Sequence, residues 1–163
     1  MLWCTIPHTP GAAPAKYLTC QLQRKEWRRE IDRERLEMSR RSILVVDDER
    51  DMLMLVKHLL EPEYRVRLAE SSMEALSMVQ QEMPDLVLLD IMMPGMNGWD
   101  FLERFRKLRG AEKVPVVIFT VRNEATEVLS GLSVEGVVDY ITKPFDAEEL
   151  KKRIREALNA GSK

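Results

Sequence analysis

The sequence predicts an α/β fold in which a parallel β-sheet is covered by helices on both faces. Three apolar runs, at residues 43–46, 86–89 and 116–119, contain no polar residue and therefore fit strands that are buried on both sides. Segments in which apolar residues recur at helical spacing lie between these runs. Such alternation is typical of a doubly wound sandwich of five strand–helix units.

Each element in the first half has its own local pattern. Residues 52–60 place apolar side chains at i, i+3, i+4, i+7 and i+8, which predicts a helix with one face on a sheet. Residues 64–69 alternate charged and apolar side chains, as a half-exposed edge strand does. Ser71 and Glu74 have the spacing of a capping box and predict the start of the next helix.

The second half repeats the alternation. After the third strand, a loop rich in Pro and Gly leads into a helix that buries apolar residues between positions 101 and 108. The fourth strand precedes a short helix at about residues 123–133. A fifth strand at 137–141 and a last helix at 146–159 complete the predicted set.

Length and composition indicate one domain with an N-terminal extension. The 163 residues exceed a typical domain by about 40. We assign 1–41 to the extension, 42–160 to the domain and 161–163 to a tail. Cys4 and Cys20 lie outside this domain, so the fold needs no disulfide and we expect a cytoplasmic protein. No apolar run approaches the roughly 18 residues of a membrane span, so we expect no membrane contact.

The extension differs in character along its length. Residues 1–20 contain several prolines and little apolar periodicity, which predicts disorder. Residues 21–38 are strong helix formers with charges of both signs, which favours a solvated helix. Met38 is an alternative start of the protein, in which case residues 1–37 are an upstream extension.

Charge is distributed unevenly between the two parts. Residues 1–41 carry nine Lys/Arg and five Asp/Glu, so residues 42–163 hold a net charge of −6 within the total of −2. Contacts to nucleic-acid phosphates need a basic surface. We therefore expect no direct binding of nucleic acid.

Three carboxylates follow two of the buried strands. Asp47 and Asp48 come directly after the run 43–46, and Asp90 comes directly after 86–89. If these strands are parallel neighbours, the three carboxylates converge, and their repulsion requires a proton or a cation among them. Oxygen ligands with no Cys or His nearby favour Mg²⁺.

Two more polar residues occupy corresponding positions. Thr120 ends the fourth apolar run, and Lys143 follows the fifth strand and precedes Pro144. A hydroxyl and an ammonium opposite a metal-bound carboxylate suit a transferred phosphoryl group.

These residues resemble the receiver domain of two-component response regulators, in the stand-alone form typical of chemotaxis regulators. The matching segments are ILVVDDE (43–49), LVLLDIMMPGMNG (86–98), VVIFT (116–120) and DYITKPF (139–145). The resemblance implies a flavodoxin-like sheet with strand order 2-1-3-4-5, which places ligands at the carboxyl ends of strands one and three.

The resemblance also implies roles for the acidic residues. Asp90 would be the phosphoacceptor. Asp47 and Asp48 would hold Mg²⁺ together with Asp90, with Asp48 the more direct ligand, and Met92 would contribute its backbone carbonyl.

Further roles follow for residues of the last two strands. Thr120 and Lys143 would contact the phosphoryl oxygens, and the Lys143–Pro144 bond is a candidate cis peptide. Tyr140 would be a switch residue that turns inward when Thr120 moves.

The function implied is a signalling receiver rather than an enzyme, with Mg²⁺ as its cofactor. A sensor histidine kinase or a phosphotransfer protein would donate the phosphoryl group, and an unidentified protein target would bind the surface formed by residues 123–133, the fifth strand and the last helix. We expect the phosphorylated protein to remain mostly monomeric.

Three alternatives fit the sequence less well. A phosphatase with an aspartyl nucleophile needs a second acid two residues after Asp90, where Met92 stands. An FMN protein needs a phosphate-binding loop after the first strand, where Asp47 and Asp48 would repel phosphate. A degenerate receiver that works unphosphorylated is disfavoured because every expected site residue is present.

Overall fold

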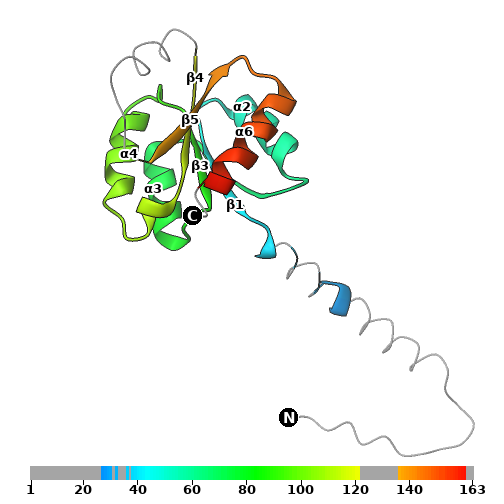
Figure 1. Cartoon of the computed structure of the whole chain (residues 1–163). Helices are drawn as coiled ribbons and strands as arrows, with labels where there is room; N and C mark the ends of the chain where they lie inside the picture. Colours follow the sequence, from blue (N-terminus) through cyan, green and yellow to red (C-terminus); the bar gives the residue numbers. More distant parts are fainter. Residues whose placement is uncertain (1–26, 31, 33–35, 37, 122–135, 161–163) are drawn as a thin grey trace, which may run out of the picture. The chain divides into compact units, whose positions relative to one another are not determined.

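The computed structural model describes residues 27–30, 32, 36, 38–121 and 136–160 (Figure 1). The chain divides into two compact units, Met1–Ser39 and Arg40–Lys163. In the first unit, the described residues are helical up to Ser39, with the side chains of Trp27 and Leu36 exposed. The helix predicted at 123–133 lies outside the described residues.

The second unit contains one parallel sheet of five strands. These are β1 (Ser42–Val46), β2 (Arg65–Ala69), β3 (Leu86–Leu89), β4 (Val116–Val121) and β5 (Val137–Lys143). Their order across the sheet is β2-β1-β3-β4-β5, with every neighbouring pair parallel (Figure 1). The predicted strand order and the prediction of β2 as a partly exposed edge strand are both confirmed.

Helices cover both faces of this sheet. The described ones are α2 (Arg50–Leu60), α3 (Ser72–Gln81), α4 (Gly98–Arg106), the short 3₁₀ helix η1 (Ala111–Lys113) and α6 (Ala147–Ala160). One apolar cluster packs α3 and α4 against the sheet, and a second packs α2 and α6 against the other face (Figure 1). In the described part of the chain, none of the helices is both long and apolar enough to cross a membrane.

Side-chain caps mark the beginnings of α3 and α6. The Ser71 hydroxyl accepts a hydrogen bond from the Glu74 N–H at 3.2 Å, as the predicted capping box requires. The Glu74 carboxylate, however, accepts from the N–H of Glu70 at 2.8 Å, one residue before the expected partner. Asp146 accepts from the N–H of Glu149 at 3.2 Å and caps α6.

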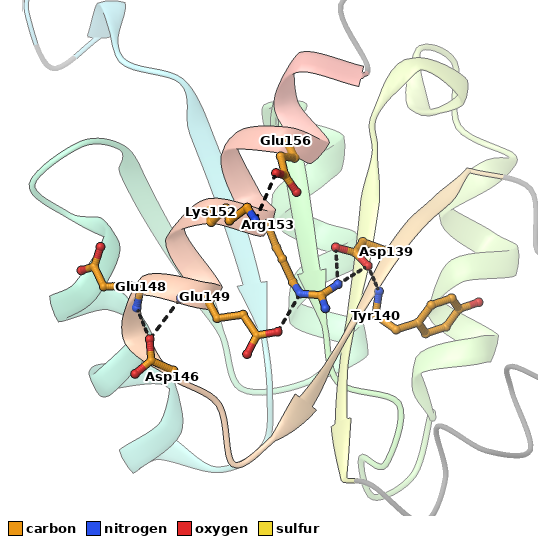
Figure 2. A network of polar contacts seen from close by, with 8 residues as sticks. All are labelled: Asp139, Tyr140, Asp146, Glu148, Glu149, Lys152, Arg153 and Glu156. Atoms are coloured by element: carbon orange, nitrogen blue, oxygen red, sulfur yellow. Dashed lines mark hydrogen bonds and ion pairs between the residues drawn. The ribbon is translucent and has the colours of Figure 1, made fainter.

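Arg153 joins the last strand to the last helix (Figure 2). From α6, its guanidinium donates to both carboxylate oxygens of Asp139 on β5, at 2.8 and 3.0 Å, and to Glu149 at 3.1 Å. Asp139 also accepts from the backbone N–H of Tyr140 at 2.8 Å. The Tyr140 ring lies on the opposite side of β5 from Arg153 (Figure 2) and packs against the cluster of α3 and α4.

Arg106 joins the end of α4 to the beginning of β5. Its guanidinium donates to the carbonyl oxygens of Ala111, Val114 at 2.9 Å and Gly136 at 2.8 Å. Gly136 has φ +82°, and a Cβ there would collide with the Arg106 guanidinium. One partly buried side chain therefore bridges two separate connections, and the carbonyls of Ala111 and Gly136 also accept backbone N–H groups, from Val114 and Val116.

We expect Arg106→Ala to lower the free energy of unfolding by about 3 kcal/mol, because three backbone acceptors would lose a charged donor. Urea denaturation followed by circular dichroism measures this loss. Arg104→Ala, an equivalent change on the exposed side of α4, should stay within about 0.5 kcal/mol of wild type. Equal losses in the two variants would show that the three contacts of Arg106 add no stability.

Candidate functional site

The adjacent strands β1 and β3 bring three carboxylates together at their carboxyl ends. Val46 and Leu89 are partners in register, so Asp47 and Asp90 follow them side by side. The Asp90 N–H donates to the Val46 carbonyl at 2.8 Å, which fixes this alignment. Asp47, Asp48 and Asp90 each offer a carboxylate oxygen, and these oxygens lie within 4.8 Å of one another. Asp47 and Asp90 are buried, whereas Asp48 is exposed.

Lys143, from the end of β5, lies across this acidic cluster. Its Nζ is 2.6 Å from Asp47 Oδ2 and 2.6 Å from Asp90 Oδ2. The same ammonium lies 4.6 Å from the centre of the Phe119 ring, and the side chain is only 11% exposed. Lys143 thus supplies the positive charge that the converging carboxylates require. The Lys143–Pro144 bond is cis, as predicted.

Burial and ion pairing act in opposite directions on the pKa values of this site. Burial raises the pKa of Asp47, against the effects of the hydrogen bonds from Lys143 and from the Glu49 N–H. Burial lowers the pKa of Lys143, but its hydrogen bonds to Asp47 and Asp90 outweigh this and the pKa is raised. Lys143 therefore stays protonated at neutral pH. Because folding raises the pKa of Asp47, the ionised carboxylate lowers the free energy of unfolding at pH values above that raised pKa. A bound cation would offset this loss of stability.

The remaining predicted residues lie around this centre. The Met92 N–H donates to Asp90 Oδ1 at 3.1 Å, and the Met92 side chain is exposed. Thr120 is fully buried near the end of β4, one residue before the register partner of Lys143. Tyr140 lies on β5 opposite Ile118. The metal-binding, phosphoryl-binding and switch roles of these residues stay predictions.

The set of donors fits a hard divalent cation. All three side chains offer oxygen, and the exposed Asp48 lies beside the two buried carboxylates. Mg²⁺ characteristically binds one or two protein carboxylates while keeping several of its waters. Asp47, Asp48 and Asp90 would hold the ion, which agrees with the cofactor that the sequence predicts.

One residue of this region was not singled out by its sequence. The sequence places Gly98 in a turn-rich loop, but it is the buried first residue of α4 and lies against the backbone of Asp90. A glycine directly after the N-cap Asn97 was the available hint. The close approach itself is a tertiary contact that no local pattern predicts.

A doubly wound parallel sheet with an acidic cluster at its switch point and a lysine across that cluster is the arrangement that the resemblance to receiver domains implies. The family model for the response regulator receiver domain matches residues 43–155. The chain therefore belongs to the response regulator receiver family, and its role is that of a signalling protein.

Curated relatives are similar over the same region. DNA-binding response regulator MtrA from Mycobacterium tuberculosis is 39% identical over 124 residues, which cover 76% of this chain and 53% of that protein. Transcriptional regulatory protein YvrH from Bacillus subtilis is 42% identical over 123 residues, covering 74% and 50%. The chain spans about half the length of the curated relatives it matches.

A solved structure supports the fold. The chemotaxis protein CheY4 from Vibrio cholerae superimposes with a TM-score of 0.64 at 26% identity, covering 73% of this chain and 99% of that one. The flavodoxin-like arrangement that the sequence predicts is confirmed.

The relatives correct the prediction about partners. We expected no nucleic acid, because the domain is acidic, but MtrA is a DNA-binding response regulator and YvrH is a transcriptional regulatory protein. That prediction was wrong. The charge of one domain describes the surface of that domain alone, whereas these relatives are about twice as long as the matched region.

Proposed function

We propose that this chain accepts a phosphoryl group on Asp90 from the phosphohistidine of a sensor kinase or a phosphotransfer protein, with Mg²⁺ bound by Asp47, Asp48 and Asp90. The observation that carries the proposal is the position of Lys143, whose ammonium lies 2.6 Å from the Asp90 carboxylate. A buried carboxylate beside a fixed cation suits attack on a phosphorus atom, because the negative charge of both reactants is partly neutralised.

The transfer forms one bond and breaks one. An Asp90 carboxylate oxygen attacks phosphorus, the P–N bond to the donor imidazole breaks, and its electron pair stays on nitrogen. The product is an acyl phosphate on Asp90. Lys143 orients and neutralises the equatorial oxygens, and Thr120 donates its hydroxyl to one of them. Mg²⁺, when bound, supplies further charge neutralisation.

Two consequences belong to this proposal. Attack of water on the acyl phosphate returns Asp90 to its free form, so the signal is temporary. Contacts of the phosphoryl group with Thr120 and Lys143 shift the populations of two conformations. Tyr140 on β5 would change its position between these two conformations. By similarity to MtrA, we propose a cytoplasmic setting and an output that controls DNA binding.

Incubation with acetyl phosphate and Mg²⁺, followed by intact-protein mass spectrometry, tests the proposal. We expect one phosphoryl group per chain when both reagents are present and none when EDTA removes the metal. A chain that takes up no phosphoryl group under these conditions would contradict the proposed function.

The two neighbouring acids should contribute unequally to Mg²⁺ binding. Asp48 is exposed, whereas Asp47 Oδ1 accepts from the Glu49 N–H at 2.8 Å and Asp47 Oδ2 accepts from Lys143. We therefore expect Asp47→Asn to weaken binding about tenfold, as loss of an outer-shell partner does, and Asp48→Asn to weaken it more. Isothermal titration calorimetry measures both affinities. Equal losses would show that the direct ligand has been misassigned.

A further inference from the structure

The first residue of α4 packs directly on the backbone of the phosphoacceptor. Gly98 is buried, and its N–H donates to the Ile91 carbonyl at 2.9 Å. A Cβ on Gly98 would lie 2.8 Å from the Ile91 Cα, 3.1 Å from the Asp90 carbonyl carbon and closer still to the Asp90 carbonyl oxygen. These neighbours are backbone atoms, so no change of side-chain rotamer could make room.

Both sides of this contact are held in place. On one side, the Asp90 N–H donates a hydrogen bond to the Val46 carbonyl of β1. On the other, the Asn97 side chain accepts from the Asp100 N–H at 2.9 Å and caps α4, and the Asn97 carbonyl accepts from the buried Ser72 hydroxyl at 3.3 Å. An added methyl group would have to displace the Asp90 backbone or move α4 away from β3.

The Asp90 carboxylate has little freedom to absorb such a displacement. Its Oδ2 lies 2.6 Å from Lys143 Nζ and its Oδ1 accepts from the Met92 N–H. We propose that Gly98 is a positioning residue for Asp90: the missing side chain lets α4 close against the end of β3 and sets the place of the carboxylate opposite Lys143. This inference rests on the proposed role of Asp90.

The first test is the rate of phosphorylation by acetyl phosphate. We expect Gly98→Ala to lower the maximal rate about 100-fold, because a displacement of about 1 Å at a reacting group has effects of that size. Gly95→Asn is the matched control. Gly95 lies in the same loop with φ +80°, a Cβ there has no atom within 4 Å, and Asn tolerates that conformation. Its rate should stay within about twofold of wild type.

A double-mutant cycle separates positioning from general damage to the fold. Mg²⁺ affinity is measured by calorimetry for the wild type, Gly98→Ala, Asp90→Ala and the double variant. If Gly98 acts through the Asp90 carboxylate, Gly98→Ala weakens binding only while Asp90 is present and adds nothing in the Asp90→Ala background. An equal loss in both backgrounds would overturn the inference.

The outcomes also distinguish this inference from the proposed function. Wild-type phosphorylation with an unchanged Gly98→Ala rate overturns the role of Gly98 alone, whereas a wild type that binds no Mg²⁺ and accepts no phosphoryl group overturns both. If Gly98→Ala does not fold, Asn97→Ala is used in the same cycle, since it only removes the cap that fixes α4. Its loss of affinity must again be confined to chains that retain Asp90.

Discussion

We expect Asp90→Ala to abolish phosphorylation of this chain completely. Asp90 is buried, lies 2.6 Å from Lys143 and stands beside the two proposed metal ligands that follow β1. Alanine removes the attacking oxygen, and the Asp47 carboxylate, which is fully buried, is not accessible to a phosphoryl donor. Intact-protein mass spectrometry after treatment with acetyl phosphate and Mg²⁺ gives the answer as a gain or no gain of mass.

The control for this variant is Asp100→Ala, which removes an exposed carboxylate from the first turn of α4. Asp100→Ala should take up one phosphoryl group, as the wild type does. Retention of the added mass in Asp90→Ala would place the phosphoacceptor elsewhere. Thermal unfolding of each variant confirms that loss of phosphorylation is not loss of structure.

The second large effect is expected for Lys143→Met, which should separate metal binding from phosphorylation. The Lys143 ammonium forms ion pairs with Asp47 Oδ2 and Asp90 Oδ2 and repels an incoming cation. Two like charges about 4 Å apart near a protein surface repel by about 4 kcal/mol, so Mg²⁺ affinity should rise at least about tenfold when Lys143 is removed. The phosphorylation rate should fall about 100-fold or more, because a preorganised charge opposite the phosphoryl oxygens is lost.

Calorimetry and the acetyl phosphate assay measure these opposite changes in one protein sample. Lys151→Met is the control, since Lys151 lies on α6 and pairs with Glu148 rather than with the site. Both of its values should equal those of wild type. Mg²⁺ affinity that stays unchanged in Lys143→Met would show that the lysine and the metal do not compete for the same oxygens.

The sheet was predictable because its strands carry strong local patterns. The runs that became β1, β3 and β4 are apolar throughout, and a strand buried on both faces allows little else. The alternation of Arg65 and Arg67 with apolar residues likewise identified β2 as an edge strand. The strand order came from family resemblance, because apolar runs alone do not determine which strands are neighbours.

The acidic cluster was also predictable from local sequence patterns, but the side-chain contacts within it were not. Asp47, Asp48 and Asp90 directly follow β1 and β3, so parallel pairing brings them together. The simultaneous contact of Lys143 with two carboxylates depends on side-chain positions from strands 53 or more residues apart. The shift of the Glu74 contact from Ser71 to Glu70 shows that even local capping depends on details finer than spacing.

The network around Arg153 has a consequence for solubility. The strand β5 forms one margin of the sheet, and exposed margins of sheets are templates onto which foreign strands add and aggregates grow. Here the Tyr140 N–H already has an acceptor in Asp139, and the Arg153 guanidinium places a charge beside it. A foreign strand would have to displace the Asp139–Arg153 ion pair in order to form a hydrogen bond with the Tyr140 N–H. Asp139 and Arg153, which join α6 to the sheet, therefore also disfavour the addition of a foreign strand at this edge.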